Sequence, residues 1–544
     1  MKNVSEIGHH LNFSRYFLNL SWRLAPLVLL PLVVATFMFS GGGEKITGDI
    51  EGQDYPRLYY HVLPVVLSAE FLGHPYDHTA DNLVRQIVWS QPLDQSINLT
   101  IKKSIEEIKK ISPSQDRYYW MVDDRGFADF AFVAFKLFGF EMASLSKLWF
   151  VLLAIFTIFL TITAWNKPKF LLFNVLYLTA LIVSVGLFQK TNIGDDPRYP
   201  MLHLTESRFF ELLAIPVLLA GLSTLDCRNK KLVSLYSIFI GASFYFLSSI
   251  RSTCKVYFYA LIIGVVVKLI INWKSRIYKK SSNALLYLTL FLATITYLSL
   301  TFLGHQIESE KYESIGKRTV FHNALMGFAY STNIGGRYGI SVSDHDALAF
   351  VIALRETDDL DQAANLKRLD QVNFRARAQI ALNWDPGTFD WEEYERDARI
   401  TFFRIIRENP KSSLQLFLVE KPRALINQVI DKTSGSLDSR FPPIQQQLLM
   451  MAIFVFGVSV LWRGRQASAL FAQAISLLLV CLGSLQSILF YPGVTQMGVL
   501  IVSISIFILS SAVSIGFLCR NKVRGFSGDT IFNGNFNTKD DEST

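Results

Sequence analysis

Three carboxylates stand close together early in the chain, at Asp49, Glu51 and Asp54. A carboxylate can accept the proton of a hydroxyl group as a general base, and several together can hold a divalent cation such as Mg²⁺ or Mn²⁺. By spacing alone, a solvated acidic linker is the simpler interpretation. The catalytic interpretation therefore needs support from the elements that position these residues.

A second polar cluster lies between residues 320 and 346. It combines four Gly residues with five polar side chains: His322, Arg337, Asp344, His345 and Asp346. Glycine lets a backbone approach a ligand closely, and His and Asp can hydrogen-bond hydroxyl groups. The cluster predicts contact with a sugar or another hydroxyl-bearing acceptor. The alternatives are a plain loop or, with a further distant ligand, a metal site.

The composition shows what kind of protein must position these residues. Of 544 residues, 51% are apolar and 18% are charged, against about 25% charged in an ordinary soluble domain. The apolar residues fall in continuous runs of about 20, which as helices cross a hydrocarbon core of about 30 Å. Only a helix satisfies its own backbone hydrogen bonds there, so these runs predict membrane spans.

The predicted fold is an all-α polytopic membrane protein with about ten transmembrane helices and two large, mainly helical extracytoplasmic segments. The predicted spans are 24–41, 146–164, 170–188, 207–224, 232–250, 255–272, 283–303, 446–462, 468–490 and 498–518. The predicted parts are an N-terminus (1–23), a first transmembrane helix (24–41), an external segment (42–145), six spans (146–303), an external helical cap (304–445), three spans (446–518) and a polar, disordered tail (519–544).

The short loops predict the orientation of these spans, because Lys and Arg near span ends stay in the cytoplasm. With both termini inside, the inner segments hold seventeen Lys and Arg residues. The short outer loops hold four: Lys190, Arg198, Arg251 and Lys255. The +8 net charge is explained by this distribution, so it gives no support to a nucleic-acid partner.

Arg251 and Lys255 lie in one short outer loop, where basic residues are disfavoured. Basic groups at the level of the lipid headgroups can neutralise the phosphate of a lipid-linked donor. The competing interpretation is that both side chains extend to ordinary lipid headgroups.

The end of the first external segment resembles a known enzyme family. Residues 122–130 are followed by Phe135-Lys136-Leu137-Phe138-Gly139 and then by Ser144, just before a predicted span. Over roughly residues 20 to 250 the chain resembles the glycosyltransferase C superfamily, whose multispan members take a sugar from a polyprenyl-phosphate or polyprenyl-diphosphate carrier.

The resemblance implies roles for acidic residues. It makes Asp49 or Asp54, just after the first span, the candidate general base that activates an acceptor hydroxyl. Some members also carry an acidic motif in the second external loop, where this chain has Asp195 and Asp196. The resemblance therefore implies a second acidic group there, with a turn before Pro197 as the structural alternative.

Three functions compete at this point. The first is a glycosyltransferase that moves a sugar from a polyprenyl-linked donor to a cell-surface glycan or glycolipid, in a bacterial inner membrane. The second is an O-antigen-type polysaccharide polymerase or ligase, with catalysis expected from His322, Arg337 and His345. The third is a non-enzymatic transporter or envelope assembly factor. P-loops, dinucleotide fingerprints and HExxH motifs are absent from the sequence, and its four cysteines form no CxxC pair.

Overall fold

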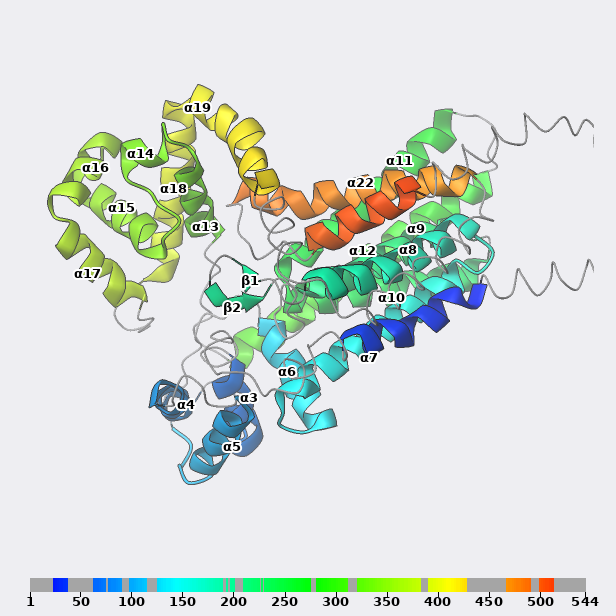
Figure 1. The fold of residues 1–544 in the computed structure, drawn as a ribbon, viewed down its shortest axis with the longest axis horizontal. Helices are drawn as coiled ribbons and strands as arrows, with labels where there is room; N and C mark the ends of the chain where they lie inside the picture. The colour runs from blue at the N-terminus through cyan, green and yellow to red at the C-terminus, as the bar shows by residue number, and fades with distance from the viewer. Residues whose placement is uncertain are drawn as a thin grey trace, which may run out of the picture.

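The computed structural model describes most of the chain, and nearly all of the described part is helical (Figure 1). The described residues are 23–37, 62–74, 77–90, 97–114, 125–188, 192–193, 196–200, 209–225, 227, 229–274, 280–311, 320–382, 390–427, 466–490 and 499–512. The predicted helical fold class is confirmed over these residues.

Four of the described helices are long and apolar enough to cross a membrane. They are α7 (Met142–Thr163), α10 (Lys230–Ile250), α11 (Lys255–Lys274) and α12 (Lys280–Lys311). Their length and composition indicate a membrane protein, because an apolar helix of about 20 residues matches the thickness of the hydrocarbon core and satisfies its own backbone hydrogen bonds there.

Five shorter apolar helical stretches fall within or overlap other predicted spans. They are Arg23–Phe37, Pro168–Ser184 in α8 (Pro168–Phe188), α9 (Phe210–Thr224), Phe471–Leu485 in α22 (Gln466–Leu489) and Val499–Ala512. Helices thus occupy nine of the ten predicted ranges in the part of the chain described, and 446–462 lies outside it. The full set of ten spans and their orientation remain predictions.

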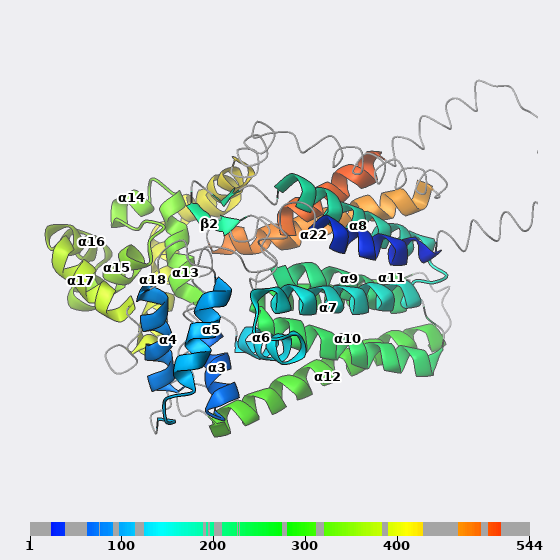
Figure 2. The same ribbon diagram turned by 60° about the horizontal axis from the view of Figure 1, so that its bottom comes forward.

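Helix α9 lies at the centre of the bundle and is buried along almost its whole length. It packs against α7, α10 and α11, and α10 packs along α12 (Figure 2). A Cβ on Gly241 of α10 would lie 2.5 Å from the carbonyl oxygen of Ala293 in α12. This small residue lets the two backbones approach closely, as in other packed membrane helices.

Two groups of helices lie beside the same end of the bundle (Figures 1 and 2). The first group is α3 (Leu63–Phe71), α4 (His78–Ser90), α5 (Ile97–Ile108) and α6 (Arg125–Phe138). The second group, here called the cap, comprises residues 320–427 and has its own apolar core. These groups correspond to the two predicted external segments, and both are helical as predicted.

The cap consists of short helices. They are α13 (Val320–Met326), η6 (Gly327–Tyr330), α14 (Gly335–Tyr338), α15 (Asp344–Thr357), α16 (Leu360–Leu369), α17 (Gln371–Leu382), α18 (Trp391–Glu408), α19 (Pro410–Gln415) and a π-helical turn, Leu416–Glu420, that continues as helix over 421–427. The alternative of a plain loop over 320–346 is wrong for most of that stretch, because α13, η6 and α14 occupy it.

A short antiparallel pair of strands departs from the helical pattern. Strand β1 (Asn192–Ile193) pairs with β2 (Asp196–Pro200), with Ile193 opposite Asp196. This hairpin follows α8 and lies at the end of the bundle that faces the cap (Figure 1). Asp196 and Pro197 lie in strand β2, and residues 194–195 lie outside the described part of the chain, so the turn alternative before Pro197 stays a prediction.

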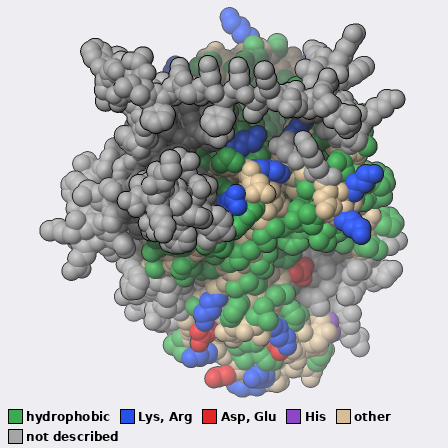
Figure 3. Space-filling model, turned by 90° about the vertical axis from the view of Figure 1, so that its right-hand side faces the viewer, with side chains coloured by type: hydrophobic (Ala, Val, Ile, Leu, Met, Phe, Trp, Pro, Cys, Tyr) green, Lys and Arg blue, Asp and Glu red, His purple; other side chains and the backbone are tan. Residues whose placement is uncertain are grey.

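The opposite end of the bundle carries basic residues at helix starts. Lys167 precedes α8 and donates a hydrogen bond to the carbonyl of Ser223 in α9, and Lys230 and Lys231 begin α10 with exposed side chains. Figure 3 looks onto this end, where Lys and Arg side chains lie on a largely apolar face.

Candidate functional site

The junction between α10 and α11 brings two basic residues to the cap-facing end of the bundle. Helix α10 ends at Ile250, a 3-10 turn (η5) spans Ser252–Cys254, and α11 begins at Lys255. The chain reverses direction within these few residues. Arg251 and Lys255 therefore flank one tight turn, and both are half-buried.

A buried carboxylate supports this turn from inside the bundle. Glu211 lies in the first turn of α9 and is 1% exposed. The hydroxyl of Thr253, in the middle of the turn, donates a hydrogen bond to its Oε1 atom. The N-terminus of a helix stabilises a negative charge, which is a favourable place for this carboxylate.

An ionisable side chain inside an apolar helix indicates a functional site, because burying it there is costly. Glu211 meets this description, yet the sequence analysis did not single it out. Its signal was present: it is an acidic residue within the predicted span 207–224. The sequence did not show which residue would be its partner, because Thr253 lies 42 residues further along the chain.

Helix α6 is packed tightly onto the same junction. A Cβ on Gly126 would lie 2.5 Å from both the carbonyl carbon and the hydroxyl of Ser249, two residues before Arg251. The backbone of α6 thus touches the end of α10 directly. A hydrogen-bonded ion pair between Lys136 and Glu70 then joins α6 to α3, with a Nζ–Oε1 distance of 2.6 Å. The first external segment is therefore attached to this end of the bundle.

The early acidic candidates are not placed at this site. Asp49, Asp54 and Asp195 lie outside the described residues. Asp196 begins strand β2, which lies at the end of the bundle that faces the cap (Figure 1). Their predicted roles as base and second acidic group stay predictions.

In the cap, His322 and Asp344 do come together, as part of a buried network. The Nε2 atom of His322 is 3.0 Å from Asp344 Oδ1, and its Nδ1 atom is 2.6 Å from the hydroxyl of Tyr394. The His322 side chain is 5% exposed, whereas Asp344 is 58% exposed. Both ring nitrogens of His322 therefore have partners within the cap.

The start of α13, which carries His322, is held by another carboxylate. Glu395 accepts hydrogen bonds from the backbone N–H groups of Phe321, at 2.6 Å, and of His322, at 3.3 Å. It satisfies N–H groups that the first turn of a helix leaves without partners. Burial raises the pKa of Glu395, although these backbone hydrogen bonds act in the opposite direction.

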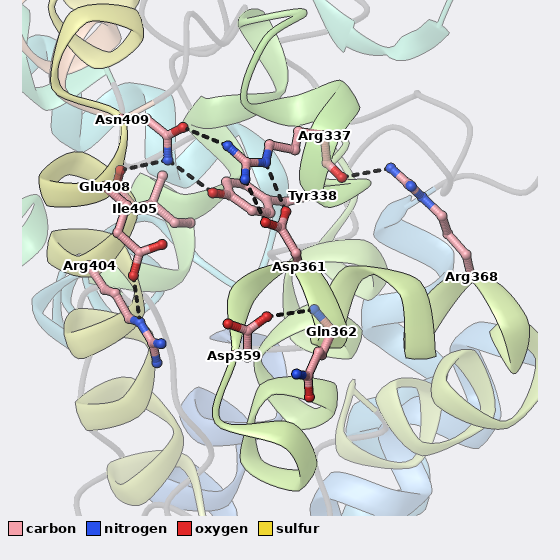
Figure 4. Close-up of polar contacts among 10 residues, drawn as sticks. All are labelled: Arg337, Tyr338, Asp359, Asp361, Gln362, Arg368, Arg404, Ile405, Glu408 and Asn409. Atoms are coloured by element: carbon pink, nitrogen blue, oxygen red, sulfur yellow. Dashed lines mark hydrogen bonds and ion pairs between the residues drawn. The ribbon is translucent and has the colours of Figure 1, made fainter.

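Arg337 forms an exposed network on the cap surface (Figure 4). Its guanidinium donates to both carboxylate oxygens of Asp361, at 2.8 and 2.5 Å, and to the Oδ1 atom of Asn409 at 3.3 Å. Asn409 in turn donates to the hydroxyl of Tyr338 at 2.9 Å. The hydrogen bond from Arg337 holds the pKa of Asp361 below its usual value. Arg337 thus ties α14 to α16 and to the end of α18.

Asp346 lies in a third, separate group. Its carboxylate accepts a hydrogen bond from Ser341 and lies 3.5 Å from Lys367 Nζ and 3.7 Å from Arg375. Burial raises the pKa of Asp346, but Ser341 and the two cations outweigh burial and lower it overall. His345, the neighbouring residue, is half-buried. The predicted acceptor cluster is thus divided among three networks, and its contact with an acceptor stays a prediction.

The described residues contain no group of three or more His, Cys, Asp or Glu side chains placed to hold a metal ion. The carboxylates named above are instead engaged by hydroxyl groups, backbone N–H groups and cations of the protein itself.

Comparison of the chain with protein-family models, curated proteins and solved structures finds no match. The resemblance to the glycosyltransferase C superfamily therefore rests on the sequence motifs alone.

Proposed function

We propose that this protein is a membrane glycosyltransferase that takes a sugar from a polyprenyl-phosphate-type carrier and transfers it to a cell-surface glycan or glycolipid. The observation that carries the proposal is the turn at Arg251–Lys255, which holds two basic side chains at the end of the bundle beside both helical segments. A lipid-linked phosphate needs such positive charges at the membrane boundary.

The hydrogen bond between Glu211 and Thr253 gives the turn a defined position. A turn anchored in this way presents Arg251 and Lys255 without first having to order the backbone. Preorganised charges of this kind are worth more than mobile ones, because they require no reorganisation when the ligand binds. In this proposal Glu211 is a positioning residue, and the two cations contact the donor phosphate.

The transfer itself requires a base on the acceptor side. The base takes the proton of the acceptor hydroxyl, the hydroxyl oxygen attacks the anomeric carbon, and the bond from that carbon to the phosphate oxygen breaks. The products are the glycosylated acceptor and the carrier phosphate. We assign the base to Asp49 or Asp54 and the second acidic group to Asp195 or Asp196, as the family resemblance implies. Any Mg²⁺ or Mn²⁺ would have to be bound by these early acidic residues.

The proposal includes an arrangement of ten spans in a bacterial inner membrane, with both termini in the cytoplasm. The basic residues Lys167, Lys230 and Lys231 support this orientation, because they lie at the bundle end away from the cap. Basic residues concentrate on the cytoplasmic side of membrane proteins. The cap and the site would then face outward.

A polymerase or ligase mechanism based on the cap residues receives less support. His322 is buried with both ring nitrogens engaged, and Arg337 is held by Asp361. A general base must have a lone pair within reach of the acceptor, and His322 would have to give up an existing partner to provide one.

The test is a donor-consumption assay on the purified chain in detergent. A panel of polyprenyl-phosphate and polyprenyl-diphosphate sugars is incubated with the wild type, and donor loss is followed by mass spectrometry. Arg251→Gln and Lys255→Gln remove the proposed phosphate contacts, and Asp49→Asn with Asp54→Asn removes the proposed base. Lys230→Gln is the matched control, since it removes a cation at the opposite end of α10.

We expect the wild type and Lys230→Gln to consume the same donor. The Arg251 and Lys255 variants should raise the donor KM by about tenfold each, which corresponds to the loss of one charge-assisted hydrogen bond. The Asp49/Asp54 variant should lose turnover but still bind the donor. Turnover that survives these changes and is abolished by His322→Ala would favour the polymerase or ligase. Failure to bind any donor would leave the transporter or assembly factor.

A further inference from the structure

The last helix of the cap has two unlike faces. Residues 410–427 form one helical rod made of α19, the π-helical turn and the helix that follows. One face is buried and consists of Ser413, Leu416, Lys421 and Leu425. The other is apolar and exposed: Leu414 is 62% exposed, Leu418 67%, Val419 45% and Ile426 57%.

The π-helical turn creates this division. Pro422 has no backbone N–H and would crowd the carbonyl four residues before it in a regular α-helix. The turn before it widens instead, and the N–H of Lys421 bonds the carbonyl of Leu416, five residues back. The extra residue keeps Leu416 and Lys421 on one face. In a regular α-helix, Glu420 would take the position of Lys421 instead.

Lys421 attaches this rod to the end of the bundle. Its ammonium group donates to the carbonyl of Phe490 at 2.6 Å and lies 3.5 Å from that of Leu489, where α22 ends. The last carbonyls of a helix have no partners within the helix, and a cation is favourable beside them. The rod thus meets the membrane helices at the cap-facing end of α22 (Figure 1).

The position of this attachment determines what the exposed face meets. Helix α22 is apolar, and its own exposed residues Leu485 and Leu489 lead up to the contact with Lys421. The rod is attached at the end of α22, so it lies at the level at which α22 emerges from the hydrocarbon core. The exposed apolar residues of the rod therefore begin beside the exposed apolar end of α22.

We propose that residues 410–427 lie on the outer membrane–water interface and bury Leu414, Leu418 and Ile426 among the lipids. Lys411 and Arg423 are exposed on the same rod, which places cations at the level of anionic headgroups. An amphipathic helix with this pattern binds in the plane of the interface. The rod anchors the cap to the membrane, and the inference stands independently of the glycosyltransferase proposal.

The test measures the environment of single residues on the full chain. The four native cysteines are replaced, and nitroxide labels are placed at Leu414→Cys and Leu418→Cys. The chain is reconstituted in nanodiscs of phosphatidylethanolamine and phosphatidylglycerol. Collision rates with oxygen, which is enriched in lipid, and with a water-soluble nickel complex are then measured.

Two controls use positions that the proposal places in water. Leu369→Cys lies at the end of α16, where Leu369 is 87% exposed, and Val372→Cys lies in α17, where Val372 is 83% exposed. Size-exclusion chromatography and circular dichroism verify that each labelled chain retains its fold.

We expect labels at 414 and 418 to collide with the nickel complex several-fold less often, and with oxygen more often, than labels at 369 and 372. Equal access of the nickel complex to all four positions would overturn the proposal. Protection of 414 and 418 from both reagents would also overturn it, because a protein surface, such as a second copy of this chain, would then cover the face.

Discussion

Two buried lysines hold the cap together in different ways. Lys367 lies in the cap core, where it donates to the carbonyl of Gly339 at 2.6 Å and faces the carboxylate of Asp346. Lys421 lies at the joint between cap and bundle, where it donates to the carbonyl of Phe490 and stacks over the ring of Phe417 at 4.3 Å. The first lysine has a carboxylate for a partner, and the second has carbonyl dipoles and an aromatic face.

This difference changes how burial affects the pKa of each lysine. Burial lowers the pKa of both lysines, but Asp346 opposes that effect at Lys367. At Lys421 burial acts alone and lowers the pKa to about 7. At Lys367 the carboxylate therefore offsets part of the effect of burial on the pKa, whereas the joint changes its protonation near neutral pH.

Breaking the ion pair in the cap core should have the largest effect. Asp346→Asn leaves Lys367 charged and buried without its carboxylate, which typically destabilises a protein by about 3 to 5 kcal/mol. The opening free energy of α15 to α17, measured by hydrogen exchange on the full chain, should fall by about 3 kcal/mol.

The exposed pair of Arg337 and Asp361 is the matched control. It has shorter ion-pair distances, but water screens it, so Asp361→Asn should cost less than about 1 kcal/mol. If both substitutions had the same small effect, burial would not be what distinguishes these two pairs.

Crowding the joint should have the next largest effect. A Cβ on Gly327 would lie 1.8 Å from the carbonyl oxygen of Phe490 and 2.5 Å from Lys421 Nζ. Gly327→Ala should therefore force the cap away from α22 at a cost of about 1 to 3 kcal/mol. Hydrogen exchange of residues 410–427 reports the loss. Gly336→Ala, with no atom within 4 Å of the added Cβ, should leave that region unchanged.

The smallest effect, taken per pH unit, should be a pH dependence confined to the joint. Between the folded pKa of Lys421, about 7, and its usual value of 10.5, the open state binds more protons than the closed one. The joint therefore becomes more stable as pH rises through this window, by about 1 kcal/mol per pH unit, and this gain is lost as pH falls towards 7.

The measurement is hydrogen exchange of residues 410–427 at several pH values above 7, corrected for the intrinsic exchange rate. Lys421→Met should remove the dependence, and α15 to α17 should not show it in either protein. A pH dependence that survives in Lys421→Met would assign the titration to another group.

Much of the helical layout follows from local sequence. Apolar runs near 146–164 and 232–250 became α7 and α10, because only a helix satisfies the backbone of such a run in lipid. Helix α18 ends at Glu408, directly before Asn409-Pro410, because the residue before a proline is disfavoured in a helix. The π-helical turn before Pro422 was not anticipated, since it depends on which face of the rod is buried.

The candidate site was less predictable. Arg251 and Lys255 were found because their charges were unusual in a short outer loop, which is a local property. Glu211 was missed because its importance depends on Thr253, a distant residue. Grouping His322, Arg337 and Asp346 by closeness in sequence failed to anticipate that each would join a different helix pair.

The sequence by itself determined that this is a helical membrane protein with two polar segments, because hydrophobic length and backbone hydrogen bonding are properties of continuous stretches. Only the tertiary structure decided which polar groups are buried and what partner each one has. The type of a residue does not by itself indicate which groups will surround it in the folded protein. Lys367 and Lys421 are chemically identical, but the fold places a carboxylate beside Lys367, which offsets part of the effect of burial on its pKa, and only carbonyls and an aromatic ring beside Lys421.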